Sequence, residues 1–135
     1  MNKATMDRTI NIEITRSPLA PFPSDATDGC GAVVEFVGIV RGEENGRSIT
    51  ALEYEAYQPM AEREIARLIG ELLIQFPCEA VRVAHRIGRV PVGEAAIALR
   101  VTSRHRAEAF SLTAGFMDRL KQEVPIWKTG VIYTS

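Results

Sequence analysis

The chain has 135 residues and a formal net charge of −1, with 46% hydrophobic and 24% charged residues. This length fits a single domain, 1–135, with a real core, and the composition excludes disordered and fibrous classes. No overall positive field draws the chain to nucleic acid or to an anionic membrane. No apolar run is long enough to span a bilayer and the first residues are not signal-like, so we expect a cytoplasmic protein.

The first part of the chain is predicted to contain three strands. Ile alternates with polar residues over 9–15, which is the period of a half-buried strand. The apolar run CGAVVEFVGIV, which ends at Arg41, is typical of a central strand covered on both faces. The hairpin signal Asn45-Gly46 leads to a strand over 49–57, and we expect these last two strands to pair antiparallel.

A helix and two further strands follow. Apolar residues at helical spacing over 61–76 indicate the helix, with Pro59 in its first turn and Pro77 as its stop. The segments 80–87 and 94–102 are predicted to be strands, with RVPVG as the turn between them.

A second helix is expected from Ser103 as N-cap to about Glu123, and a final strand over 126–135. The buried stripe of this helix is predicted to contain Ala107, Phe110, Ala114, Met117 and Leu120. The order βββαββαβ predicts a compact α+β fold with a mostly antiparallel sheet and two main helices.

The two cysteines, Cys30 and Cys78, match no metal or redox motif in their spacing. We expect both to be buried, inert thiols, because free Cys packs as a small hydrophobe. A disulfide is not expected in a reducing cytosol.

Lysine is scarce in this chain: only Lys3, Lys121 and Lys128 occur, against thirteen Arg. Burial lowers the pKa of Lys more readily than that of Arg, which suits Lys to proton transfer or nucleophilic chemistry. The ordinary explanation is that Lys121 complements the helix dipole at a C-terminus and that Lys128 is a solvated strand residue. The residues alone leave both explanations open.

Three basic residues, Arg104, His105 and Arg106, stand at the predicted start of the second helix. Cations there oppose the helix dipole, whereas the free N–H groups favour an anion, so a bound phosphate or carboxylate would compensate them. The alternative is a solvated cluster. Arg41, at a predicted strand end, is most simply a surface charge, and His85 shares a strand face with apolar residues, which favours a hydrogen-bonded core histidine.

The predicted helix also limits which of these residues can meet. At 1.5 Å per residue, the sixteen positions from His105 to Lys121 span about 24 Å. One small substrate therefore cannot contact both within a single chain. Either they serve different sites, or two subunits of a twofold dimer share one site.

Five segments in series resemble the large, catalytic subunit of molybdopterin synthase: GAVVEFVGIVRG, LEYEAYQPMAE, VRVAHRIGRVPVGE, VTSRHRAEAF and DRLKQEVPIWK. The resemblance covers roughly Gly31 to Lys128. It implies an α/β-hammerhead fold and a homodimer at the centre of a heterotetramer. It also implies a sulfurtransferase that moves sulfur from the C-terminal Gly-Gly thiocarboxylate of a small ubiquitin-like carrier onto cyclic pyranopterin monophosphate. Two such transfers build the dithiolene of molybdopterin in molybdenum cofactor biosynthesis, and no metal or other cofactor is implied.

The resemblance assigns roles residue by residue. Lys121 and Lys128 correspond to the catalytic pocket lysines, Arg41 to an arginine at a strand end, and His105 and Arg106 to a substrate-binding pair from the partner subunit. The family commonly continues after its Trp-Lys pair with further charged residues, whereas Thr129 and Gly130 follow here and the sequence stops at Ser135. We therefore expect the closure of the pocket and the docking of the carrier tail to differ from those of other members of the family.

The main alternative is a non-catalytic α+β dimer that binds an anionic metabolite or the sulfur carrier. Nucleic-acid binding is disfavoured, because the net charge is slightly negative and basic residues do not alternate with exposed aromatic residues.

Overall fold

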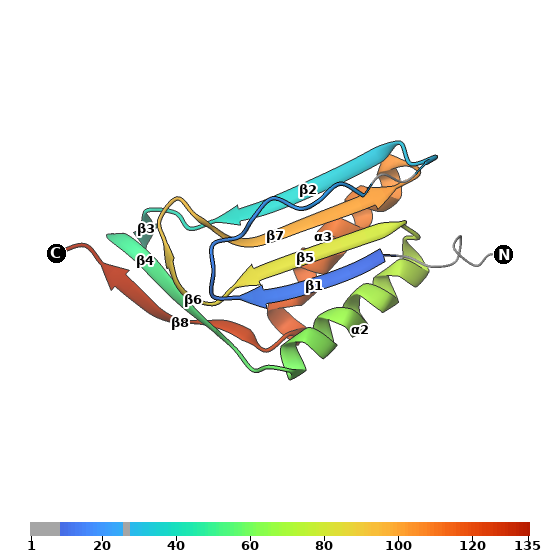
Figure 1. Cartoon of the computed structure of the whole chain (residues 1–135). Coiled ribbons are helices and arrows are strands. Elements are labelled where there is room, and N and C mark those ends of the chain that lie inside the picture. The colour runs from blue at the N-terminus through green and yellow to red at the C-terminus, as the bar shows by residue number, and fades with distance from the viewer. Residues whose placement is uncertain (1–8, 26–27) are drawn as a thin grey trace.

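A computed structural model describes residues 9–25 and 28–135 and shows two sheets with two helices (Figure 1). The main sheet has the order β1-β5-β7-β2, formed by β1 (Thr9–Thr15), β5 (Ala80–Arg86), β7 (Ala95–Ser103) and β2 (Ala32–Ile39). β1 and β5 run parallel, and the other two pairs are antiparallel.

The second sheet is antiparallel and is built around the ten-residue strand β4. It contains β3 (Glu43–Glu44), β4 (Arg47–Ala56), β6 (Gly88–Pro91) and β8 (Ile126–Tyr133). The predicted turn at Asn45-Gly46 is confirmed, and both residues have positive φ as a tight hairpin requires.

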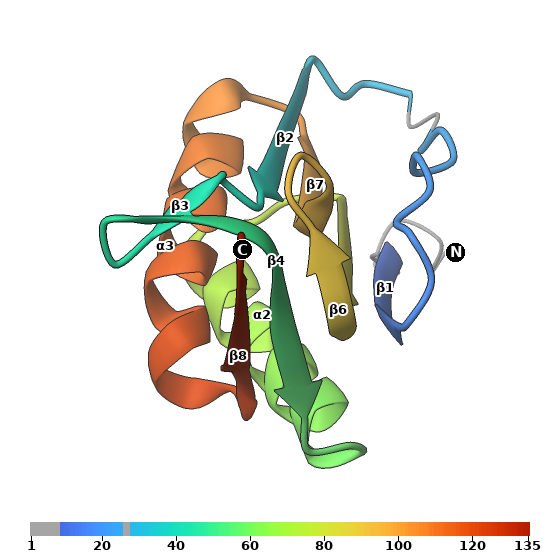
Figure 2. The same ribbon diagram turned by 90° about the vertical axis from the view of Figure 1, so that its left-hand side faces the viewer.

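The two helices, α2 (Met60–Gln75) and α3 (Arg106–Glu123), pack on one face of the main sheet. The segment that follows β1 runs over the opposite face (Figure 2), where Arg82 on β5 pairs with Asp25 at 2.8 Å. Neither helix is long and apolar enough to cross a membrane.

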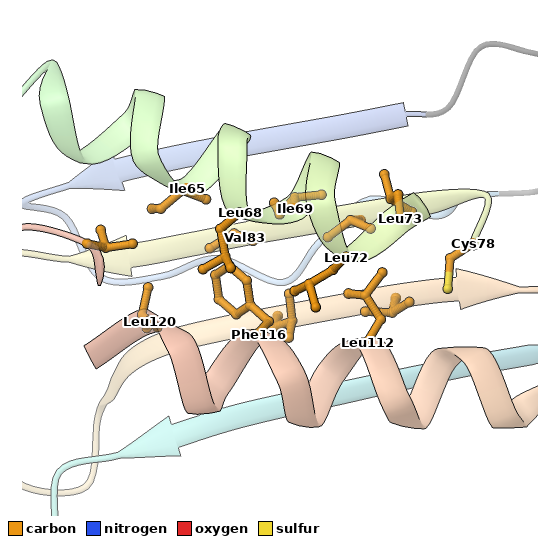
Figure 3. Packing of buried hydrophobic residues seen from close by; sticks show 14 of the residues in the cluster. Ile65, Leu68, Ile69, Leu72, Leu73, Cys78, Val83, Leu112, Phe116 and Leu120 are labelled. Atoms are coloured by element: carbon orange, nitrogen blue, oxygen red, sulfur yellow. The ribbon is translucent and has the colours of Figure 1, made fainter. Parts of the chain in front are cut away.

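The main core lies between α2, α3 and the sheet. Figure 3 shows Leu68 and Leu72 of α2 meeting Leu112 and Phe116 of α3. Gly115 permits this close approach, because a Cβ atom there would lie 3.0 Å from Leu72 Cδ2. At the surface, Arg119 of α3 also bonds Glu71 of α2 at 2.7 Å.

The α+β class, the two helices and the mostly antiparallel pairing were predicted correctly. The first helix follows Pro59 and ends before Pro77 as expected. The predicted order holds for the longer elements, but the structure adds β3 and β6. β6 occupies part of the segment predicted to be a turn, because its Leu52-to-Val90 register with β4 places it in the second sheet.

Two predictions about β2 are wrong. The strand does not pair with β4; it pairs with β7, and the hairpin partner of β4 is the short strand β3. β2 is also not central: it forms an edge of the main sheet, and Val33 and Val37 are 62% and 45% exposed. A continuous apolar run indicates that both faces of a strand need to be covered, but it does not say what covers them. In the single chain, nothing among the described residues covers this edge of the sheet.

The predicted buried face of the second helix is also wrong at Ala107, Phe110 and Ala114, which are exposed. Leu120 is buried as predicted, and Met117 is partly buried against the core. The buried residues of α3 are Ala109, Leu112, Thr113, Phe116 and Leu120, and Phe110 is 59% exposed. The helix carries two apolar stripes, and the stripe that contains Gly115 and the larger side chains faces α2. The helix also begins later than expected, with His105 rather than Ser103 as its N-cap.

Neither cysteine forms a disulfide, but only one matches the expectation of burial. Cys78 is buried in the main core, whereas Cys30, which lies before the edge strand β2, is partly exposed.

We expect Phe116→Ala to lower the free energy of unfolding by about 3–5 kcal/mol, because it removes a fully buried ring from the centre of the core. Phe110→Ala, on the exposed face of the same helix, is the matched control and should cost less than about 1 kcal/mol in the monomeric protein, where this side chain is 59% exposed. Urea unfolding of both variants measures the difference. Equal losses would contradict the orientation of α3.

Candidate functional site

A hollow of about 510 Å³ lies where the two sheets meet the C-terminal end of α3. We call it the lysine pocket. It is lined by Phe36, Gly38 and Ile39 of β2, Tyr54 of β4, His85 of β5, Ala96 and Ile97 of β7, Met117, Leu120 and Lys121 of α3, and Ile126, Trp127 and Lys128 of β8. Five strands and one helix thus contribute, and most of the wall is apolar.

The two lysines singled out by composition come together in this pocket. Lys121 lies in the last turn of α3, and Lys128 lies on β8 opposite Tyr54. Both side chains are exposed, so the low-dielectric surroundings invoked from the sequence are absent in the single chain. Lys128 Nζ donates a hydrogen bond of 2.6 Å to Glu44 Oε2 on the β3 hairpin.

Tyr54 and His85 are site residues that the sequence did not indicate. Their rings meet edge to face, with centroids 5.5 Å apart. Burial raises the pKa of Tyr54, the charge of Lys128 opposes this shift, and Glu44 adds to it. The phenol therefore stays a proton donor near neutral pH.

His85 is buried and hydrogen-bonded, as a core histidine should be, yet it forms part of the pocket wall. Its Nδ1 lies 2.8 Å from the carbonyl oxygen of Arg86. A carbonyl only accepts, so Nδ1 carries the proton and Nε2 holds the lone pair. Burial lowers the pKa of His85, and the backbone contact to Arg86 opposes this shift.

One glycine keeps the pocket open at the end of β2. A Cβ atom on Gly38 would lie 2.8 Å from Ile97 Cγ2 and 3.5 Å from the ring of Phe36. Any side chain there would displace Ile97, which lines the pocket, and would contact the ring of Phe36.

The predicted basic cluster lines a separate hollow of about 420 Å³ at the start of α3. Gly31, Arg104, His105, Arg106 and Ala107 form its walls. His105 is the N-cap but makes no side-chain capping bond, so the first-turn N–H groups lack that partner. Glu108, in the first turn, supplies negative charge that partly offsets the unfavourable cations.

Arg41 lies in neither of these hollows. It is exposed and lines a third one, of about 610 Å³, formed by the hairpin residues 41–46. This hairpin still reaches the lysine pocket, because its Glu44 contacts Lys128.

The structure therefore brings together the two lysines but not the five predicted site residues. His105 and Arg106 lie at one end of α3 and Lys121 at the other, as the helix-length argument predicted for a single chain. Among residues 9–25 and 28–135, no group of three or more His, Cys, Asp or Glu side chains could hold a metal ion.

Comparisons with known proteins agree with this architecture. A sequence model of the MoaE protein family matches residues 12–123. A protein of Thermoplasma volcanium named molybdopterin synthase catalytic subunit is 42% identical over 90% of this chain and 90% of its own length. A protein of Bos taurus with the same name is 43% identical over 93% of this chain and 63% of its own length.

A crystal structure of molybdopterin synthase from Staphylococcus aureus has the same fold. It matches with a TM-score of 0.79 and 32% identity, covering 91% of this chain and 96% of that chain. This chain spans between 50% and 63% of the length of three mammalian relatives that it matches. The family match runs from β1 to the end of α3 and includes Lys121, and on this evidence the chain belongs to the MoaE protein family.

Proposed function

We propose that this chain is the catalytic subunit of a molybdopterin synthase, a sulfurtransferase of molybdenum cofactor biosynthesis. It moves sulfur from the C-terminal thiocarboxylate of a small ubiquitin-like carrier onto cyclic pyranopterin monophosphate and so forms the dithiolene of molybdopterin. The observation that carries the proposal is the convergence of Lys121 and Lys128, from different elements, on one apolar-walled pocket. Relatives named molybdopterin synthase catalytic subunit support it.

The two lysines suit the charges that this reaction develops. An ammonium group stabilises a thiocarboxylate, protonates the oxygen that leaves the pterin side chain, and stabilises the acyl intermediate. The apolar wall, which includes Phe36, Met117 and Trp127, limits water and strengthens these interactions. The carrier tail would cover the lysines, which are exposed in the single chain.

The basic residues outside the lysine pocket suit the cyclic phosphate of the substrate. Arg41 and Arg106 hold phosphate through the planar guanidinium fork, and His105 stands at a helix start whose N–H groups favour an anion. Because His105 and Arg106 lie in a different hollow from the lysines, we propose that they act in the site of a partner subunit.

The edge strand β2 supports this shared site. It exposes Val33 and Val37 and has a free edge among the described residues, which is the type of surface that a second strand covers. Gly31, the residue before β2, borders the basic hollow, and the end of β2, at Gly38 and Ile39, borders the lysine pocket. A second copy placed antiparallel beside β2 by a twofold axis would bring the basic hollow of one chain to the lysine pocket of the other.

The resulting assembly is a homodimer with one carrier on each subunit, a heterotetramer. We place the reaction in the cytosol, a reducing compartment in which cysteines stay as thiols; neither Cys30 nor Cys78 forms a disulfide.

A non-catalytic module remains the second candidate function, and one contact favours it. Lys128 is already paired with Glu44 at 2.6 Å, so its charge is partly neutralised. In that case the protein would bind the carrier or an anionic metabolite without converting it.

We expect Lys121→Ala and Lys128→Ala each to reduce molybdopterin formation by at least about 100-fold, because each removes a charged proton donor from the pocket. The assay mixes the protein with thiocarboxylated carrier and cyclic pyranopterin monophosphate, and circular dichroism confirms the fold. Near-wild-type turnover by both variants would contradict the assigned roles. Binding of both ligands by the wild-type protein without dithiolene formation would favour the non-catalytic module.

A mixture of two inactive variants tests the shared site. Each heterodimer of Lys128→Ala with an Arg106→Ala partner contains one site with both mutations and one site with neither. An equal mixture, after subunit exchange, should therefore regain about a quarter of the wild-type activity if dimers form at random. Activity that stays at the level of the separate variants would show that one chain supplies all of its own residues.

We expect Val37→Asp to convert the dimer to a monomer, because it places a charge on the edge strand at the proposed interface. Light scattering should then give the mass of one chain, 14.9 kDa, instead of twice that mass. The control is Ile74→Asp on α2, which changes an 84% exposed side chain away from β2 and should leave the dimer intact. A Val37→Asp protein that remains dimeric would place the interface elsewhere.

A further inference from the structure

His85 differs chemically from every other titratable residue that lines the lysine pocket. The others are Tyr54, Lys121 and Lys128. A phenol and an ammonium group are proton donors, and an ammonium group has no lone pair with which to accept a proton. Burial also raises the pKa of Tyr54. The imidazole of His85 is therefore the pocket's one proton acceptor near neutral pH.

The surroundings of His85 fix which nitrogen accepts. Nδ1 donates to the Arg86 carbonyl at 2.8 Å, and the Tyr54 ring packs edge to face against the imidazole. Within the part of the chain that the structure describes, Nδ1 makes the only hydrogen bond of this side chain. The lone pair of Nε2 thus remains available in a ring held on two sides.

The neighbouring groups leave His85 neutral. Its partners on the adjacent strands are the apolar Ile14 of β1 and Ile97 of β7. The charged groups of the pocket are Lys121 and Lys128, with Glu44 bound to the latter. The next side chain along β5, Arg86, is paired with Glu94 at 2.6 Å.

The proposed reaction has a step that requires a base. When the sulfur of the carrier has bonded to the pterin substrate, the carrier remains attached through an acyl–sulfur bond, and water must release it. Once the lysine that protonated the leaving oxygen has regained a proton from solvent, both lysines stabilise the charge of this step as ammonium groups. An ammonium group has no lone pair and cannot take the proton of the water. Resting on the proposed function, we propose that His85 is the general base for this hydrolysis, with Nε2 accepting the proton.

The step balances without a further reactant. The water oxygen forms a bond to the acyl carbon of the carrier's terminal residue while His85 Nε2 takes one proton. The carbon–sulfur bond breaks, its electron pair stays on sulfur, and the substrate leaves as a thiolate. The new carboxylic acid of the carrier loses the second proton of the water to solvent and leaves as a carboxylate, and His85 returns the first proton to solvent. Lys121 and Lys128 stabilise the tetrahedral oxyanion and the thiolate.

The pH dependence follows from the burial of His85. A buried imidazole has a pKa below the ordinary value of 6.5, so the neutral base is present above this lowered pKa. Hydrolysis should therefore be constant near neutral pH and fall as the pH drops through the lowered pKa, which lies below 6.5.

His85→Asn is the sharpest variant, because the amide nitrogen of Asn can replace Nδ1 as donor to the Arg86 carbonyl while the acceptor at Nε2 is lost. The protein is mixed with thiocarboxylated carrier and cyclic pyranopterin monophosphate, and samples are quenched and measured by mass spectrometry. We expect the carrier–pterin adduct to form within a few-fold of the wild-type rate. Its hydrolysis should slow by at least about 100-fold, and the hydrolysis that remains should no longer fall as the pH drops through the lowered pKa of His85. Added imidazole should restore part of the hydrolysis in His85→Ala.

Three outcomes would overturn the inference. Hydrolysis by His85→Asn at the wild-type rate and with the wild-type pH profile would show that His85 is not the base. Adduct formation that slows as much as hydrolysis, or a loss of rate that only follows a lower melting temperature, would show a structural role. A wild-type protein that forms neither adduct nor product would refute the proposed function itself, and the inference would fall with it.

Discussion

The rigid length of α3 is the constraint on which the arrangement of the site depends. Its 18 residues extend over about 27 Å, and buried contacts through Leu112, Phe116 and Leu120 fix it on the main sheet. The basic cluster lies at the start of this helix and Lys121 lies in its last turn, so the fold holds the two groups apart in every copy of the chain. Any substrate that contacts both must lie between two copies.

The strand β4 provides the second fixed frame. It pairs with β6 and β8, and its hairpin partner β3 carries Glu44, so one long strand positions Tyr54, Lys128 and the carboxylate that binds Lys128. Strand β5 of the main sheet adds His85 to the same pocket. The lysine pocket lies between the two sheets and is lined by side chains from both of them. Donors therefore come mainly from α3 and the β4–β8 pair, and the acceptor comes from β5.

The sequence predicted the elements well and their partners poorly, for identifiable reasons. α2 has a single apolar stripe between two prolines, so local spacing sufficed, and Asn45-Gly46 marks a turn that needs no tertiary context. The lysines were found because Lys is rare here, a signal that required no structure. Tyr54 and His85 gave no such signal, because their role arises only when β4 and β5 meet at the pocket, and the local pattern of His85 is that of an ordinary core residue.

Two of the three wrong predictions of burial, those for β2 and α3, share a physical cause. The apolar run of β2 and one stripe of α3 have the sequence patterns of buried surfaces. Val33, Val37 and Ile39 of the strand, and Ala107, Phe110 and Ala114 of the helix, are nevertheless solvent-exposed in the single chain. Both stretches run from the basic hollow toward the lysine pocket: Ala107 lines the first, and Met117, at the far end of the same stripe, lines the second. Large exposed apolar surfaces in a globular protein commonly mark an interface. A second copy over this surface would bury the apolar residues of β2 and α3 that the sequence pattern predicts to be buried. The same interface would bring the basic hollow of one chain to the lysine pocket of the other, so it would account for both the apolar pattern and the separation of the site residues.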